Sequence, residues 1–216
     1  MDHSSSAAAR MTVQSQSSSR RQDGSEGQRE ILAAAQKLFT TIGYRKTTVA
    51  DIAAELGMSP ANVYRFFDSK KSINEGVAEL LLDGIVADLA VIAASTARPS
   101  TRLAEFLRTL ARLSDERFMT NSRVNDMVED AMTESWSVCV RYAERVQAMV
   151  ARIVEDGRVS GEFSIEDAAI GAGCVKVAMT CFMHPTMMAL STDFDRPGIE
   201  EVIAFILRGL GQKAAG

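Results

Sequence analysis

Hydrophobic residues recur along most of the chain at helical spacing, three or four positions apart. The first such run is SEGQREILAAAQKLFTTIG, residues 25–43, where apolar side chains return on one face and a Gly ends the segment. A second run, TTVADIAAELG, residues 47–57, shows the same spacing over a shorter length. We find no alternation of β-branched and polar residues long enough to predict a strand. The pattern therefore predicts an all-α protein.

The two segments on either side of Gly57 carry the signals of two short helices joined at a tight corner. Thr48 and Asp51 have the spacing of a capping box at the start of the first helix. Ser59 followed by Pro is a favoured start for the second. Gly57 permits the sharp turn and Met58 fills the corner between the helices. This arrangement predicts a helix-turn-helix whose second helix is barely two turns long.

The second of these helices has an apolar side and a polar side. On a wheel of 100° per residue, Phe66 and Phe67 lie within about 60° of Val63, so we expect all three to face inward. The opposite side is outward and carries Ala61, Asn62, Tyr64 and Arg65.

Longer helical patterns fill the rest of the chain. Ser69 caps the first of them, and Pro99 breaks the chain after it. We expect helices over about 70–95, 101–118, 122–132, 133–157, 164–183 and 198–210. By contrast, residues 1–25 are rich in Ser, Ala, Gln and Arg and nearly lack large apolar side chains, so we expect this N-terminal extension to be disordered.

Composition narrows the class of protein. The 216 residues are 46% hydrophobic and 24% charged, as in an ordinary globular chain. The three cysteines form no C-x-x-C pair, and no signal-peptide pattern begins the chain, so we expect a cytoplasmic protein. The apolar stretch 168–190 contains Lys176 near its middle and favours a helix buried in an interface over a membrane span.

Charge divides unevenly between the two parts of the chain. Residues 1–72 carry a net charge of +3 and residues 73–216 a net charge of −7, within an overall −4. A basic N-terminal third predicts an anionic partner there.

Residues 29–73 resemble the DNA-binding domain of the tetracycline-repressor (TetR) family. The matching pieces are ILAAA..LF...G, TTVADIA, G.S...VY..F and the SK that enters the fourth helix. The resemblance implies a three-helix DNA-binding domain over 26–72 and a larger helical ligand-binding and dimerisation domain over 73–216. The Ala61-Asn62 pair departs from the Gly-Thr or Gly-Ser often found in the family, which leaves the operator sequence open.

The residue types on the outward face suit DNA. Arg65 can donate to the O6 and N7 atoms of guanine, and Asn62 can pair with adenine. Tyr64 can reach a phosphate, as can Lys70 and Lys71 and free N–H groups near Thr47 and Thr48 at helix starts, with Arg45 and Lys46 nearby. The predicted DNA-binding residues are Thr47, Thr48, Ser59, Ala61, Asn62, Tyr64, Arg65, Lys70 and Lys71. The alternative is a plain solvated face.

One short helix makes too few contacts for specificity, so we expect a homodimer that reads a palindromic operator of double-stranded DNA. The last two helices suit its interface. Residues 165–183 are rich in Ala and Gly, and the final helix offers apolar residues from Val202 to Leu210. We therefore expect a nucleoid-associated regulator in the cytoplasm.

Eight of the eleven methionines fall between Met119 and Met188, and methionine adapts to ligands of varied shape. They accompany an aromatic stripe that predicts a pocket for a small apolar or amphipathic effector. The residues predicted to line it are Phe106, Phe118, Met119, Met132, Trp136, Cys139 and Tyr142. The same stripe also suits plain core.

Two other function classes compete with a ligand-released repressor. A DNA-organising or division-linked protein would use the same DNA-binding domain without an effector. An enzyme would need paired carboxylates, a nucleophile with its base, or a metal motif, and we find none in the sequence. His184 has no second ligand at metal spacing, so we predict a structural role for it and neither a metal nor a cofactor for the protein.

Overall fold

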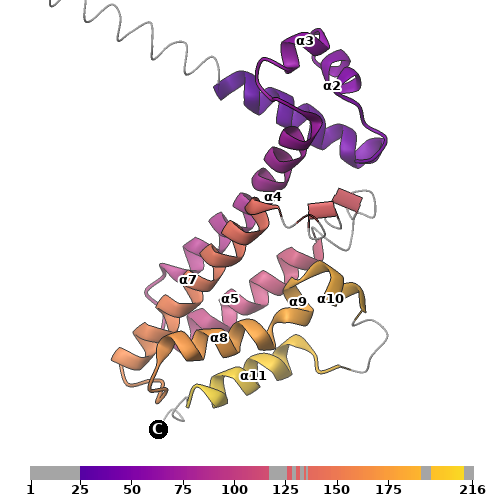
Figure 1. The fold of residues 1–216 in the computed structure, drawn as a ribbon. Coiled ribbons are helices and arrows are strands. Elements are labelled where there is room, and N and C mark those ends of the chain that lie inside the picture. Colours follow the sequence, from indigo (N-terminus) through magenta and orange to yellow (C-terminus); the bar gives the residue numbers. More distant parts are fainter. Residues whose placement is uncertain are drawn as a thin grey trace, which may run out of the picture. The chain divides into compact units, whose positions relative to one another are not determined.

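The structure is a computed structural model that describes residues 25–116, 126–127, 130–131, 134, 136–190 and 196–211. Within these residues every regular element is a helix, which confirms the predicted all-α class (Figure 1). The chain divides into two compact units, one ending at Val77 and the other beginning at Ala78. The sequence-based boundary lies after residue 72.

The N-terminal unit contains a helix over residues 25–41, then α2 (Val49–Glu55), α3 (Pro60–Val63) and the first residues of α4 (Lys70–Ala93). Its core is the apolar face predicted for the first helix together with one or two residues from each of the others. The fully or almost fully buried members are Ile31, Ala35, Phe39, Ile52, Ala53, Val63 and Ile73. Ile42 was placed on this face but is 44% exposed, because the helix has ended before it.

The loop between the first helix and α2 is anchored from inside. Gly43 adopts a φ of 106°, which favours glycine, and turns the chain. Tyr44 then packs edge-on against Phe39, with ring centroids 5.6 Å apart, and Asn74 donates a hydrogen bond to the Tyr44 hydroxyl at 3.3 Å. The loop therefore has a fixed path into α2.

The C-terminal unit contains the remainder of α4, then α5 (Pro99–Ser114), α7 (Ser137–Val159), α8 (Ala168–Ala178), α9 (Thr180–Met183), α10 (Pro185–Leu190) and α11 (Ile199–Gly209). In Figure 1, α5 lies against α7 and α11, and α8 lies against α7. Their inward faces bury Phe106, Leu107, Ile153, Val154, Val175 and Ile203.

Two helix boundaries differ from the sequence-based prediction. Pro99 was expected to precede a helix, but it occupies the first turn of α5, where its missing N–H costs nothing. The single helix expected over 164–183 is instead two. Asp167 caps α8, which ends at Ala178, and α9 follows to Met183. His184 then leaves the helical conformation, as a residue before proline tends to do.

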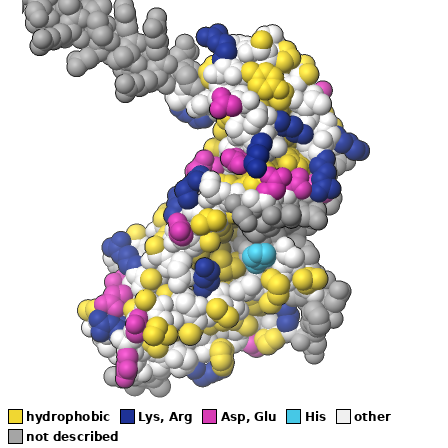
Figure 2. All heavy atoms as spheres, viewed as in Figure 1, with side chains coloured by type: hydrophobic (Ala, Val, Ile, Leu, Met, Phe, Trp, Pro, Cys, Tyr) yellow, Lys and Arg dark blue, Asp and Glu magenta, His cyan; other side chains and the backbone are white. Residues whose placement is uncertain are grey.

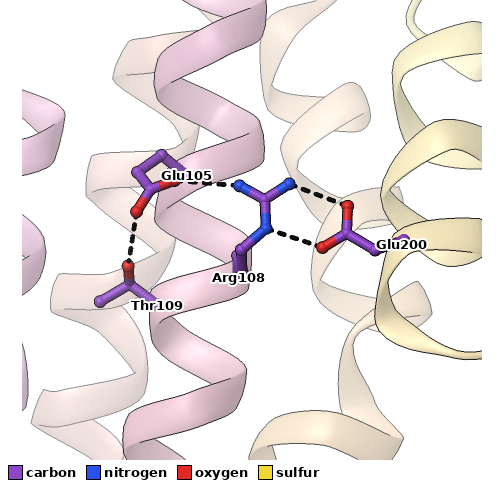
Figure 3. Close-up of polar contacts among 4 residues, drawn as sticks. All are labelled: Glu105, Arg108, Thr109 and Glu200. Atoms are coloured by element: carbon purple, nitrogen blue, oxygen red, sulfur yellow. Dashed lines mark hydrogen bonds and ion pairs between the residues drawn. The ribbon is translucent and has the colours of Figure 1, made fainter.

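Charged side chains join the helices of this unit at several points. Arg108 of α5 pairs with Glu200 of α11 and with Glu105 of its own helix, and Thr109 donates to Glu105 (Figure 3). The hydrogen bonds between Arg108 and Glu200 raise the pKa of Arg108 above its ordinary value. They also lower the pKa of Glu200 below its ordinary value. Arg141 of α7 pairs with Glu79 of α4 at 2.8 Å, one turn from an ion pair between Arg145 and Asp83.

Three other predictions concern the whole chain. Among the residues that the structure describes, none of the helices combines the length and apolar character needed to cross a bilayer. The same residues contain no cluster of His, Cys, Asp and Glu suited to a metal ion. Residues 1–24 of the segment expected to be disordered, and most of the helix expected over 122–132, lie outside the described residues, whereas Ser25 begins the first helix.

Candidate nucleic-acid interface and ligand cleft

The corner between α2 and α3 is built by backbone hydrogen bonds. After α2, Gly57 takes a φ of 64° and its N–H donates to the carbonyl of Ala54 at 3.1 Å. The N–H of Met58 donates to the carbonyl of Ala53 at 2.9 Å. Together these two bonds form a Schellman motif, which ends a helix and redirects the chain sharply. Gly57 therefore serves the role expected of it from the sequence.

The helix after this corner is shorter than predicted. Ser59 caps α3 by accepting a hydrogen bond from the N–H of Asn62 at 3.3 Å, as expected. The α-helix proper covers only Pro60–Val63, and the chain continues in turns. In these turns the N–H groups of Arg65 and Phe66 donate three residues back, to Asn62 and Val63. Val63 is fully buried and anchors the segment from below.

The outward side of this segment carries the predicted polar set. Ala61, Tyr64 and Arg65 are exposed, and Tyr64 keeps 50% of its surface open. Arg65 donates from Nη1 to Oδ1 of the half-buried Asn62 at 3.4 Å, and Asn62 Nδ2 lies 3.8 Å from the sulfur of Met58. The arrangement presents a guanidinium, an amide and a phenol side by side, the donors and acceptors that base edges and phosphates recognise.

Two predicted phosphate contacts need correction. Thr47 is completely buried, and both its N–H and its hydroxyl donate to the carbonyl of Gly43. Thr48 uses its N–H and hydroxyl on the carboxylate of Asp51, at 2.8 and 2.7 Å. Neither N–H is free, because both residues stabilise the entry into α2. The hydrogen bonds from Thr48 hold the pKa of Asp51 below its ordinary value.

Lys70 also has an internal role that the sequence did not reveal. Its Nζ lies 3.2 Å from the carbonyl oxygen of Tyr44 and 5.4 Å from the centroid of the Tyr44 side-chain ring. Burial lowers the pKa of Lys70, and the charge of Asp51 acts in the opposite direction. Lys70 thus fastens the loop before α2 to the start of α4, whereas Lys71, the other predicted contact, is exposed.

The surroundings of this surface are cationic. Arg45 and Lys46 are exposed on the loop held by Lys70. Figure 2 shows Lys and Arg side chains spread over the N-terminal unit on the face drawn there. The exposed cations agree with the net positive charge of residues 1–72, and they supply the attraction to phosphate that precedes any reading of bases.

The residues predicted to line an effector pocket lie in differing surroundings. Phe106, Trp136 and Tyr142 are buried in the helical core, and the Trp136 indole donates to Glu134 at 3.0 Å. Cys139 is half-buried, and burial raises the pKa of its thiol. Phe118, Met119 and Met132 lie outside the described residues.

A small cleft, partly open to solvent, lies among α5, α7, α8 and α9 of the C-terminal unit. None of the predicted pocket residues lines it. Its walls are formed by Leu107, Leu110, Ala143, Val146, Gln147, Val150, Val175, Lys176, Met179 and Met183. The sequence signal that could have indicated this place is the spacing of Val146 and Val150 on one face of the predicted helix 133–157.

Family models match both units. Residues 31–77 match the model described as bacterial regulatory proteins, tetR family, and residues 99–205 match the tetracyclin repressor-like C-terminal domain. Together the two models span most of the chain.

Individual relatives agree with this assignment. Nucleoid occlusion factor SlmA of Shewanella frigidimarina is 47% identical over 58 residues, which are 27% of this chain and 29% of SlmA. The transcriptional repressor KstR2 of Rhodococcus jostii is 38% identical over 73 residues, 33% of this chain and 36% of KstR2. The chain thus matches about a third of the length of these curated relatives. The solved structure of RolR with resorcinol superposes with a TM-score of 0.62 at 18% identity, over 90% of this chain and 92% of RolR.

A short polar helix set on a tight corner of a small helical unit defines a helix-turn-helix DNA-binding protein. The chain belongs to the TetR family and is a DNA-binding transcriptional regulator. Its fold and domains are those of regulators of this family.

Proposed function

We propose that this regulator is a repressor that binds a palindromic operator as a homodimer and is released by a small apolar or amphipathic ligand. The observation that carries the proposal is the outward pair of Asn62 and Arg65 beside the buried anchor Val63. A side chain that is exposed, cationic and held in place by a neighbour suits bidentate recognition of guanine in the major groove. Tyr64, Ser59 and Lys71 would then contact phosphates.

The proposed dimer interface is the outer side of α8 and α11. Ile170 and Val177 of α8 are 63% and 76% exposed, and Phe205 of α11 is 67% exposed. Gly173 lies between the first two, and a Cβ added to it would meet no atom within 4 Å, so another helix can approach closely there. Two copies of this face related by a two-fold axis would form a four-helix bundle. Two DNA-binding units about 34–36 Å apart then match a palindrome.

Ligand release completes the proposal. A ligand that binds more tightly to the conformation unable to bind the operator increases the population of that conformation. Moving the ratio of the two conformations from 1:99 to 99:1 needs about 5.5 kcal/mol of differential binding. Two apolar ligands per dimer can supply this. Phe106, Trp136, Cys139 and Tyr142 remain proposed contacts, reached if the core helices separate. RolR, which shares the fold, is solved with resorcinol bound, which supports a small effector here.

The similarity to SlmA favours a second candidate function. This match covers 26–27% of the chain, and SlmA is a nucleoid occlusion factor. A DNA-organising or division-linked protein would bind many genomic sites and need no small effector.

In-vitro selection from random DNA duplexes separates the two candidates. The repressor proposal expects one palindromic winner, with affinity that falls with rising salt and falls further for Arg65→Ala. Arg152→Ala is the matched control, because Arg152 is an exposed cation of the C-terminal unit and should leave operator affinity unchanged. Salt-sensitive binding with no enriched sequence would reject the specific repressor and favour the DNA-organising protein.

A further inference from the structure

The cleft among α5, α7, α8 and α9 has an apolar body. Leu107 and Leu110 form one wall, Val146 and Val150 a second, and Met179 and Met183 a third. Methionine side chains change shape at little cost, so this third wall can adapt to an inserted chain. Between its walls the cleft has room for little more than a water molecule, so the adaptable methionine wall would have to move to admit a narrow chain.

Two polar side chains complete the lining, Gln147 of α7 and Lys176 of α8. Lys176 is exposed and Gln147 is half-buried. Within the described parts of the chain, neither side chain has a hydrogen-bond or ion-pair partner. The lining contains no Asp or Glu. The cleft therefore combines an apolar body with one uncompensated positive charge and an amide beside it.

Charge complementarity identifies the occupant. We infer that this cleft binds an amphipathic monoanion, a straight-chain carboxylate whose tail lies among the Leu, Val and Met side chains and whose head meets Lys176. The carboxylate would accept hydrogen bonds from the Lys176 ammonium and the Gln147 amide, and bonds between charged groups are stronger than neutral ones. A neutral alcohol forgoes that gain, and a cation is repelled by Lys176.

Lys176 lies at the edge of the proposed dimer face. Lys176 is displaced by about 100° from Val177 around α8, away from the line of Ile170, Cys174 and Val177. It lies between that exposed line and the buried Val175. All lining residues come from a single chain, so the binding site needs no partner. Its role as the effector site rests on the proposed function.

Titration calorimetry on the full chain tests the inference with defined probes. The carboxylates are hexanoate, octanoate, decanoate and dodecanoate, each below its micelle concentration, and the matched controls for decanoate are 1-decanol and decyltrimethylammonium. We expect at least one carboxylate to bind, and decanoate to bind more tightly than both controls. Lys176→Gln should weaken decanoate binding roughly five- to tenfold, less than the loss of a buried charge-assisted hydrogen bond, because Lys176 is exposed to solvent. Lys176→Glu should reverse the preference toward decyltrimethylammonium.

Arg152→Gln is the matched variant, because it removes one exposed positive charge from the same unit away from the cleft lining. It should leave decanoate affinity unchanged. Three outcomes would overturn the inference: no carboxylate binds, decanoate and 1-decanol bind equally, or Lys176→Gln and Arg152→Gln weaken binding alike. Far-ultraviolet circular dichroism of each variant confirms that it is folded.

A parallel measurement of operator affinity keeps the two proposals apart. If decanoate binds through Lys176 but leaves operator affinity unchanged, the anion site stands and ligand release by it is rejected. If the protein selects no operator at all, the repressor proposal fails, and the calorimetry still decides whether the cleft binds carboxylates.

Discussion

The guanidinium of Arg65 donates a hydrogen bond to the side-chain oxygen of Asn62, three residues earlier, at 3.4 Å. Asn62 in turn directs its amide nitrogen at the sulfur of Met58, 3.8 Å away. This chain of contacts fixes which end of the amide faces Arg65. Asn62 therefore acts first as a support for the arginine, and pairing with adenine would require it to leave these partners.

We predict that Arg65 and Asn62 are energetically coupled in operator binding. Arg65→Ala should cost about 1–3 kcal/mol on the selected operator and relax the preference for guanine at one position per half-site. Asn62→Ala should cost less, and less still when Arg65 is already alanine, because its support role is then gone. Fluorescence anisotropy on the single and double variants measures the coupling. Strictly additive losses would show that Asn62 contacts DNA independently.

The capping box of α2 predicts a pH dependence. Because hydrogen bonds from Thr48 lower the pKa of Asp51, the ionised carboxylate stabilises the folded unit. That contribution is fully present above the ordinary pKa of 3.8 and is lost as the pH falls through the lower, folded value. Asp51→Asn should therefore increase amide hydrogen exchange in α2 at neutral pH, and the difference from the parent should shrink below about pH 4.

The matched control for this variant is Asp68→Asn, which removes an exposed carboxylate outside the capping box in the same unit. It should leave the protection of α2 unchanged. An Asp51→Asn effect that stayed constant down to about pH 3 would assign the loss to packing rather than to charge.

Asp156 and Glu155 are adjacent residues with different predicted effects on stability. Asp156 lies 2.6 Å from Arg102, whose side chain is only 9% exposed and also donates to the carbonyl of Ala93. Asp156→Asn leaves that buried charge without its anion and should cost about 1–3 kcal/mol, less than a fully buried pair because Asp156 is partly solvated. Glu155→Gln breaks only an exposed pair with Arg158 and should change stability little.

Urea unfolding followed by the fluorescence of the buried Trp136 compares these two variants in one experiment. Equal midpoints for both would contradict the importance assigned to the Arg102 contact.

Because the proposed dimer interface on α8 and α11 is apolar, a charged side chain introduced there should weaken the dimer. Phe205→Glu should shift the protein from dimer to monomer, because a carboxylate would have to be buried without a partner. Operator affinity should fall with it. Val159→Glu is the matched control, since Val159 is 72% exposed at the end of α7, outside the proposed interface. Sedimentation velocity distinguishes the two, and a Phe205→Glu dimer would place the interface elsewhere.

Local signals in the sequence predicted the DNA-binding unit well. Thr48, Gly57 and Ser59 act through bonds to residues only two or three positions away, so their spacing reveals their roles. Lys70 differs, because its partners Tyr44 and Arg45 lie far away in sequence and no periodic pattern marks them. Its position at a predicted helix start therefore suggested phosphate binding.

The residues that would line an effector pocket are harder to predict for the same reason. Aromatic and methionine stripes mark buried faces equally well whether they enclose a ligand or one another, and Phe106 and Trp136 are core. The cleft depends on where α5, α7, α8 and α9 meet, and the end of α8 at Ala178 is part of that geometry. Lys176, the charge that disfavoured a membrane span in the sequence, is the one charged residue in the lining.

Cys174 is exposed between Ile170 and Val177, whereas Cys139 and Cys181 are half-buried. The chain thus carries one readily alkylated thiol in the middle of the surface proposed to be covered in the dimer. The rate at which Cys174 reacts with a maleimide should report subunit exchange. The reaction should be fast in a dissociated chain, and in the dimer it should be limited by the rate of dissociation. The native sequence therefore contains its own chemical reporter of assembly, with no label to be engineered.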